Sequence, residues 1–175
     1  MEPLRTRSLA VRVVTTGSVD ITELADVAAQ TFPLACPPTT ALENIASFID
    51  TNLSAERFEE YLADPQRAII TAAQNGRIIG YAMLIRDDGA DETAELSKMY
   101  VVADHHGAGV STALMERTLA IAKEWGMRRV WLGVNQGNQR AQRFYAKNGF
   151  KVNGTRTFQV GARRENDYVM VRELD

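Results

Sequence analysis

The sequence of 175 residues predicts an α/β fold in which helices cover both faces of one mixed sheet. The first observation is the order of its periodic segments, which is strand, helices, three strands, helix, strand, helix and two strands. The second is that some of these strands are joined by tight turns and others by helices, so that hairpins mix with crossovers. The third is the length, which suits a single domain over residues 1–175.

The chain begins with a short strand and a capped helix. Residues 9–14 are rich in β-branched side chains, which favours a strand. Ser18 or Asp20 can cap a helix that runs to about Thr31. We expect Pro33 to stop this helix and to begin an irregular elbow.

Two more helices and a hairpin follow. Apolar residues at helical spacing predict a helix over 42–53, and Ser54 is placed to cap another helix that runs to residue 62. The period then changes, and residues 68–73 and 77–86 are predicted to be strands. Asn75-Gly76 between them predicts a type I′ turn, because both residues adopt positive φ readily.

The second half of the chain alternates strands with helices. We expect a strand over 94–102, a helix over 109–125, a strand over 130–134, a helix over 138–148, and closing strands over 151–160 and 168–172. A loop near residues 158–166 is expected before the last strand. No internal repeat, linker or low-complexity segment divides the chain.

Composition excludes several classes of protein. The longest uninterrupted apolar stretch has eight residues, whereas a membrane span needs about 20, so no membrane partner is expected. The one cysteine, Cys36, cannot form an internal disulfide or a cysteine-based zinc site. No export pattern is seen at the N-terminus, so a cytoplasmic protein is expected. The net charge of −2 predicts no general affinity for nucleic acid.

The charges are nevertheless distributed unevenly. Residues 1–97 hold 7 Lys and Arg against 15 Asp and Glu, a balance of −8, and residues 98–175 hold 13 against 7, a balance of +6. This asymmetry suits an anion bound by the C-terminal half and a cation that approaches the N-terminal half. Uneven sampling of solvated faces is the alternative explanation.

A glycine-rich turn between a predicted strand and a predicted helix is the first sign of chemistry. It has the sequence His106-Gly107-Ala108-Gly109-Val110-Ser111. Glycines there let the backbone turn successive N–H groups toward a ligand, and the start of the helix favours an anion such as phosphate. The pattern is neither a dinucleotide fingerprint nor a P-loop. By itself it is also compatible with a plain strand-to-helix turn.

The turn and a second motif together resemble the GCN5-related N-acetyltransferase (GNAT) superfamily. The superfamily's phosphate loop has the form Gln/Arg-x-x-Gly-x-Gly/Ala, and its downstream pattern is matched by Asn138, Ala141, Phe144, Tyr145, Gly149 and Phe150. Two departures are His106, where Gln or Arg is usual, and Ser111, where Gly or Ala is usual. The resemblance implies a mixed, mostly antiparallel sheet of about seven strands, one N-acetyltransferase domain, acetyl-CoA as co-substrate and no metal.

The resemblance also implies which residues hold the co-substrate. Met99, Tyr100 and Val101 match the strand segment whose backbone pairs with the pantetheine arm. His106, Gly107, Ala108, Gly109, Val110 and Ser111 match the diphosphate loop, and Asn138 matches a side chain that contacts the cofactor. Three nearby cations are candidates for the CoA phosphates, although solvated helix positions would explain them equally: Arg140, Arg143 and Lys147.

Two residues carry the implied catalysis. Tyr145 matches the phenol that protonates the departing thiolate, and Glu95 lies where several members have a carboxylate that deprotonates the amine. The predicted reaction is direct attack of an amine on acetyl-CoA in a ternary complex. Alternatively, Glu95 is a solvated edge carboxylate and Tyr145 a packed aromatic. His105 and His106 are expected to be loop residues rather than metal ligands, and Cys36 a packed or loop thiol rather than a nucleophile.

The amine acceptor is predicted from the helical insertion. Residues 31–67 and the loop near 158–166 should determine specificity, and the insertion carries six carboxylates that could attract a cation: Glu43, Asp50, Glu56, Glu59, Glu60 and Asp64. This half and the C-terminal segment are similar to PaiA-type polyamine N-acetyltransferases, which act on spermidine and spermine. A protein α-amino group, an antibiotic amine, and a non-catalytic acyl-CoA sensor remain alternatives. A homodimer is compatible with the resemblance.

Overall fold

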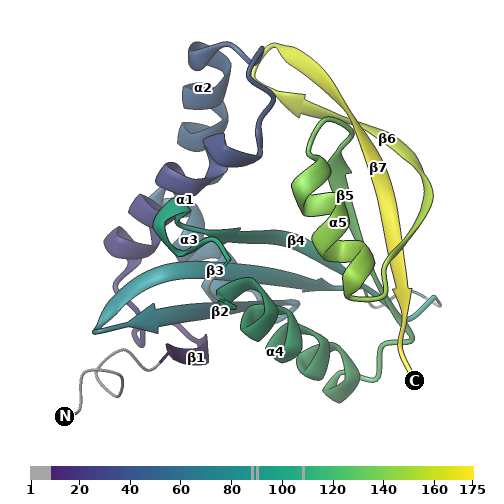
Figure 1. Cartoon of the computed structure of the whole chain (residues 1–175). Coiled ribbons are helices and arrows are strands. Elements are labelled where there is room, and N and C mark those ends of the chain that lie inside the picture. Colours follow the sequence, from purple (N-terminus) through teal and green to yellow (C-terminus); the bar gives the residue numbers. More distant parts are fainter. Residues whose placement is uncertain (1–8, 88, 90, 108) are drawn as a thin grey trace.

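The computed structural model describes residues 9–87, 89, 91–107 and 109–175, and these residues form one sheet with helices around it (Figure 1). The strands are β1 (Leu9–Val14), β2 (Arg67–Gln74), β3 (Arg77–Arg86), β4 (Thr93–Val101), β5 (Arg129–Asn135), β6 (Lys151–Val160) and β7 (Arg163–Glu173). The helices are α1 (Ile21–Ala35), α2 (Leu42–Asn52), α3 (Ala55–Ala63), α4 (Val110–Glu124) and α5 (Gln139–Lys147), with a short 3₁₀ turn at Ala103–His105.

The sheet has seven strands in the order β1-β2-β3-β4-β5-β7-β6. Every neighbouring pair is antiparallel except β4 and β5, which are parallel. The crossover between those two strands runs through α4, as a parallel connection requires. The expected mixed, mostly antiparallel sheet is therefore confirmed.

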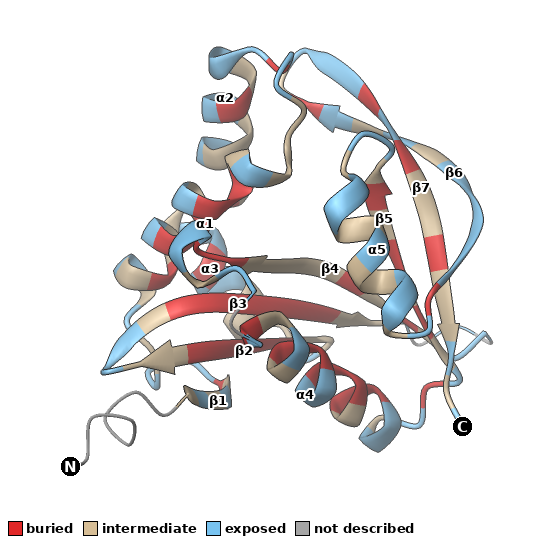
Figure 2. Cartoon of the chain, viewed as in Figure 1, coloured by how far each residue is buried: buried red, intermediate tan, exposed pale blue. Residues whose placement is uncertain are grey.

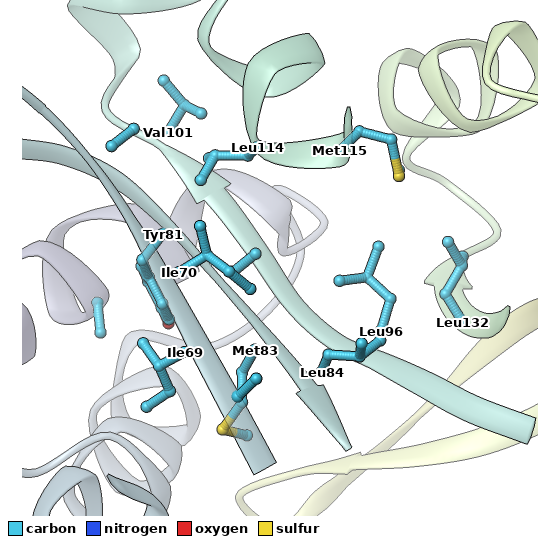
Figure 3. Packing of buried hydrophobic residues seen from close by; sticks show 14 of the residues in the cluster. Ile69, Ile70, Tyr81, Met83, Leu84, Leu96, Val101, Leu114, Met115 and Leu132 are labelled. Atoms are coloured by element: carbon cyan, nitrogen blue, oxygen red, sulfur yellow. The ribbon is translucent and has the colours of Figure 1, made fainter. Parts of the chain in front are cut away.

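Helices pack on both faces of the first four strands, as expected. Leu114 and Met115 of α4 lie over the sheet face to which Ile70 and Leu84 belong (Figure 3). On the opposite face α1 and α3 pack on β2 and β3, where Tyr81 meets an aromatic ring of α3. Figure 2 shows that the buried residues concentrate along these central strands and that α4 also has a series of buried residues. Successive side chains of a strand point to opposite faces of the sheet. These strands therefore present two apolar faces, and helices cover both.

The local signals for helix starts and for the hairpin are confirmed. The side chains of Asp20 and Ser54 accept hydrogen bonds from the backbone N–H groups three residues later, which caps α1 and α3. Asn75 and Gly76 have φ of 54° and 77°, the positive values that a type I′ turn needs. The longest helices, α1 and α4, have 15 residues each. No helix within the described ranges is long and apolar enough to cross a membrane.

Two expected boundaries are wrong. Pro33 lies inside α1, which continues to Ala35. The proline lies in the last turn, where its missing N–H removes only one hydrogen bond and packing of the helix outweighs that loss. The loop expected near residues 158–166 is a two-residue turn, because β6 ends at Val160 and β7 begins at Arg163. Gly161, with φ of 59°, permits the tight reversal.

Candidate active site

A cavity opens where β4 and β5 separate. The two strands pair only from Thr93 to Glu95 with Arg129 to Trp131 among the described residues. Beyond Glu95 the strands diverge, so the backbone groups of β4 that face β5 have no sheet partner there. A cavity of about 790 Å³ lies in this split and extends to the loop before α4 and to α5.

A β-bulge bends β4 at the same place. Met83 of β3 pairs with Lys98 and Leu84 pairs with Leu96, so Ser97 has no partner in β3. Bulges increase strand twist and redirect side chains. Ser97 consequently lines both the main cavity and a smaller one of about 180 Å³ beside it.

The glycine-rich loop borders the main cavity with open hydrogen-bond donors. Gly107 and Gly109 both have φ of 82°, and a Cβ added at either position would have nothing within 4 Å. Their φ angles, rather than crowding, therefore favour glycine. Within the described part of the chain, the backbone N–H groups of Gly107, Gly109, Val110 and Ser111 make no hydrogen bond. The loop can therefore present several donors to an anion at the start of α4.

Hydrogen bonds fix the tautomer of His106. Its Nδ1 lies 2.6 Å from Nη1 of Arg140, and its Nε2 lies 2.7 Å from the carbonyl oxygen of Val101. Because a guanidinium only donates and a carbonyl only accepts, Nδ1 must accept and Nε2 must carry the proton. The imidazole thus connects the end of β4 to α5 across the cavity.

Helix α5 supplies an aromatic hydroxyl and several cations to the cavity. The ring of Tyr145 packs edge-on against Phe144 and Phe150, at centroid distances of 5.6 Å and 5.9 Å. Burial raises the pKa of Tyr145 to about 12, so its hydroxyl keeps its proton at neutral pH. Asn138 caps the helix by accepting a hydrogen bond from Ala141 N–H. The three cations suggested by the sequence also line the cavity: Arg140, Arg143 and Lys147.

The smaller cavity contains Glu95. Its side chain is 25% exposed, and Oε2 lies 3.8 Å from Nη1 of Arg156. Burial raises the pKa of Glu95 above its usual value, and the positive charges of Arg156 and Lys98 oppose that rise. Glu95 lies on the central strand β4, so it is not an exposed edge carboxylate.

Arg156 of β6 is the centre of an ionic cluster that the sequence did not predict. Its Nε lies 3.2 Å from Oδ2 of Asp167, its direct partner on β7, in addition to the contact with Glu95. Its guanidinium also lies over the ring of Trp131, 5.5 Å from the centroid. A Cβ added at Gly133 would overlap this guanidinium, so the glycine provides the space for it.

The smaller cavity has a second cation, Lys98. Burial and the nearby charge of Arg67 lower the pKa of Lys98 to about 8, although Glu95 opposes the shift. Its Nζ lies 5.7 Å from the ring centroid of Tyr61. Lys98 makes no hydrogen bond or ion pair with any other described residue. In a regular strand the side chains of Ser97 and Lys98 would point to opposite faces of the sheet. Because of the bulge, both residues line the smaller cavity.

The expected acidic mouth is not formed by the insertion. None of its six carboxylates is among the described residues that line either cavity, and Glu60 and Asp64 are paired with arginines. They lie on the exposed sides of α2 and α3 or just after α3 because the apolar sides pack inward. The insertion instead contributes Phe32, Phe48 and Asn52 to the smaller cavity. The carboxylates that line the main cavity are Glu165 and Asp167 of β7.

Cys36 lines the main cavity as a protonated thiol. Burial, with a smaller contribution from the charge of Glu165, raises the pKa of Cys36 to about 11. Its Sγ lies 3.7 Å from the carbonyl oxygen of Phe32. A thiolate nucleophile is disfavoured in this environment.

The structure brings most of the sequence-predicted residues to one place. Those that line the main cavity are Met99, Tyr100, Val101, His106, Gly107, Gly109, Ser111, Asn138 and Tyr145. Glu95 lines the adjoining smaller cavity, and the two cavities share five residues: Phe32, Ser97, Tyr100, Arg156 and Phe158. The side chain of Val110 is buried in the core, and Ala108 lies outside the described residues.

Comparisons with known proteins agree with this arrangement. Residues 29–150 match the model of the acetyltransferase (GNAT) family. An uncharacterized N-acetyltransferase of Mycobacterium tuberculosis is 67% identical over 155 residues, which cover 89% of this chain and 98% of the relative. Both findings show that the protein belongs to the acyltransferase class of enzymes.

Solved structures share the fold. The PaiA N-acetyltransferase of Thermoplasma acidophilum, in complex with coenzyme A, has a TM-score of 0.81 at 22% identity, over 95% of this chain and 99% of that one. The ribosomal-protein-S18-alanine N-acetyltransferase of Escherichia coli has a TM-score of 0.71 at 19% identity, over 96% and 95%. The split sheet, the open loop and these matches together show that the chain belongs to the acetyltransferase (GNAT) family, whose members transfer acyl groups.

Proposed function

We propose that this acyltransferase moves the acetyl group of acetyl-CoA directly to a primary amine, with both substrates bound at once. The observation that carries the proposal is the loop of unpaired N–H groups at the end of the split between β4 and β5. Such a loop suits a diphosphate, and the split leaves room for an extended chain beside β4. The likeness to an N-acetyltransferase structure in complex with coenzyme A supports the choice of donor.

The donor would be held by the backbone and by α5. The N–H groups of Gly107, Gly109 and Ser111 would bind the diphosphate, and the free edge of β4 at Met99 to Val101 would pair with the pantetheine arm. Arg140, Arg143 and Lys147 line the same cavity and would neutralise the phosphates. Ser111 adds a hydroxyl where the family usually has Gly or Ala, so a further donor is available.

Glu95 would accept the proton of the incoming amine. An alkylamine with a pKa of about 10.4 must lose a proton at a cost of about 4.6 kcal/mol at pH 7. A half-buried carboxylate whose pKa is raised is a better base than an exposed one. The nitrogen then attacks the thioester carbonyl and a C–N bond forms. The proton passes to Glu95 through water, because Glu95 lines the smaller cavity and not the main one.

Tyr145 would complete the reaction. The carbonyl oxygen becomes negative during attack, and a β4 N–H left unpaired by the split can stabilise that charge. When the C–S bond breaks, the thiolate takes a proton from the phenol. The high pKa of Tyr145 keeps the phenol protonated and ready to donate.

The acceptor is proposed at the level of a small amine. A polyamine such as spermidine is one candidate, supported by the likeness to PaiA. A protein α-amino group is the second, supported by the likeness to the S18-alanine enzyme; its pKa of about 7.7–8.0 makes deprotonation easier. An antibiotic amine is a third candidate, and a sensor that binds acyl-CoA without turnover is the alternative to catalysis.

Release of free thiol from acetyl-CoA tests the proposal across polyamines, alkylamines and peptides with free N-termini. We expect turnover with at least one amine and intersecting double-reciprocal lines, as for a ternary complex. Parallel lines together with a trapped acetyl-enzyme would contradict direct transfer. Tight CoA binding without turnover on any amine would favour the sensor.

A further inference from the structure

We propose that the smaller cavity binds an anionic group, a carboxylate above all, at the far end of the amine acceptor, and that Lys98 is the residue that binds it. The inference rests on the proposed function and refines its substrate class. The favoured acceptor would then carry an amine at one end and a carboxylate at the other, with a short apolar chain between them.

The first argument is the pairing of charges in this region. Asp167 and Glu95 both lie within 4 Å of Arg156, at 3.2 Å and 3.8 Å, and Oε1 of Glu165 lies 3.1 Å from Nε of Arg163. Each carboxylate that lines the two cavities in the described chain therefore lies within 4 Å of a cation, but Glu95 and Asp167 share Arg156, and Oε1 of Glu165 accepts no hydrogen bond. Lys98, by contrast, makes no hydrogen bond or ion pair within 4 Å with any described residue, although the charge of Glu95 in the same cavity acts on it from farther away. In the smaller cavity a second ammonium would be repelled by Lys98 and Arg156, whereas an anion would meet the ammonium of Lys98, which no described residue pairs within 4 Å.

The second argument is the composition of the cavity wall. Around Lys98 the wall has an amide from Asn52 and a hydroxyl from Ser97, both of which can donate to a carboxylate. The amide of Asn52 already donates to the carbonyl oxygen of Phe48 at 3.2 Å, which orients it and leaves a second N–H on the same nitrogen. An anion at this position would thus find a charged donor and neutral donors together.

The third argument is the shape of the cavity between the two ends. Phe32 and Phe48 stack with a centroid distance of 4.3 Å, and Phe48 lies 5.5 Å from Phe158. These rings form an apolar wall beside the polar groups. A volume of about 180 Å³ equals about six water molecules, enough for a carboxylate and a few methylene groups. Because the two cavities share Ser97 and Tyr100, an acceptor could reach from Lys98 to the main cavity.

The charge on Lys98 lowers the stability of the folded protein. Such a cost is expected of a residue whose role is to bind a ligand. Burial lowers the pKa of Lys98 to about 8, so the protein holds a partly desolvated ammonium at neutral pH. Glu95, Arg67 and Arg156 are the charged groups that share its surroundings. A bound carboxylate would favour the charged form.

The experiment compares three acceptor series in which the chain length is matched and only the far end changes. These are ω-amino acids, α,ω-diamines and n-alkylamines, each with the same run of methylenes beside the reacting amine. We expect kcat/KM at pH 7 to be highest for the ω-amino acid of the best length and lowest for the diamine. In Lys98→Met the ratio of kcat/KM for amino acid over alkylamine should fall about 10- to 100-fold.

Two further variants control the comparison. Lys98→Arg keeps the charge and should keep most of the preference. Lys123→Met removes an exposed lysine from the end of α4 and should leave the ratio at the wild-type value. A diamine that is the best acceptor of wild type, or a preference that survives Lys98→Met, overturns the inference.

A binding measurement separates this inference from the proposed function. The n-alkanoate of matched length, which has no amine, is titrated into the CoA complex by calorimetry, with wild type and Lys98→Met. Turnover of alkylamines without any gain from a carboxylate overturns the Lys98 inference alone. Absence of turnover with every amine, together with Lys98-dependent alkanoate binding, overturns the transferase proposal alone. Neither turnover nor Lys98-dependent binding overturns both.

Discussion

Arg140 donates a hydrogen bond of 2.6 Å to Nδ1 of His106, whose Nε2–H donates in turn to the carbonyl oxygen of Val101. This relay shows how histidine can replace glutamine, which is one of the two residues, Gln and Arg, that are usual at this position in the family. A glutamine side chain also has an acceptor oxygen and a donor nitrogen, so it can accept from the guanidinium and donate to the carbonyl. His106 thus holds the loop through the same two bonds.

His106→Gln is therefore expected to bind CoA as well as wild type does. His106→Ala loses both bonds and should bind CoA about fivefold more weakly, which corresponds to about 1 kcal/mol. Isothermal titration calorimetry measures both affinities. Equal weakening in the two variants would contradict the relay.

Tyr145→Phe is expected to lower kcat by about 100-fold, in line with the loss of a general acid. The phenylalanine ring can keep the edge-on contacts with Phe144 and Phe150, so the folded structure and the affinity for CoA should be retained. Thiol release gives the rate, and far-UV circular dichroism checks the fold. If Tyr145→Phe kept full activity, the hydroxyl of Tyr145 would have no role in the reaction.

The rate should fall as pH is lowered through the raised pKa of Glu95, because the base must be ionised. Lys98→Met removes a positive charge that holds this pKa down, so the acid limb of the kcat/KM profile should move to higher pH. Glu95→Gln should be slow and should lack that limb. A limb that moves to lower pH in Lys98→Met, or persists in Glu95→Gln, assigns the titration to another group.

Gly133→Ala is expected to displace the guanidinium of Arg156, because the added methyl would overlap it. Arg156 would then lose its contacts with Asp167 and Glu95, and kcat/KM should fall about tenfold. Gly154→Ala is the matched control, since a Cβ on that β6 glycine has nothing within 4 Å. An equal loss in both variants would point to a general effect on the sheet.

Lys98→Met is expected to stabilise the protein. At pH 7 the native state holds a desolvated ammonium that the unfolded state hydrates fully, so an isosteric apolar side chain should add about 1 kcal/mol to the free energy of unfolding. In wild type this free energy should rise between about pH 8 and the unfolded pKa near 10.4, because only the unfolded state binds the proton there.

Urea unfolding at several pH values measures both effects. Lys98→Met should lack the contribution of Lys98 to the rise, and Lys123→Met should resemble wild type. Destabilisation by Lys98→Met would mean that the lysine contributes to packing or pairing in the folded state.

Local chemistry made much of the fold predictable. The Asn75-Gly76 turn, the caps at Asp20 and Ser54, and the glycines before α4 depend on backbone angles and donors within a few residues. These signals do not depend on what packs against them. The position of Pro33 shows the limit, because tertiary packing carried α1 two residues past it.

The ionic cluster could not be predicted in the same way. Arg156 meets Asp167 because β6 and β7 pair in one particular register, and it meets Glu95 because β7 lies beside β5 and β5 beside β4. No local pattern encodes that order of strands. The bulge at Ser97 has the same character, since one extra residue in β4 decides that Lys98 shares a cavity with Glu95.

The short parallel ladder between β4 and β5 makes a seam in the molecule. This seam joins two half-sheets, β1–β4 and β5–β7, through the pairs of Thr93, Ala94 and Glu95 with Arg129, Val130 and Trp131 (Figure 1). Amide protons beside this seam should exchange with solvent faster than those in the β2–β3 hairpin. A thioester arm laid along the open edge would act as an added strand, so donor binding should slow exchange on both sides and couple the two half-sheets mechanically.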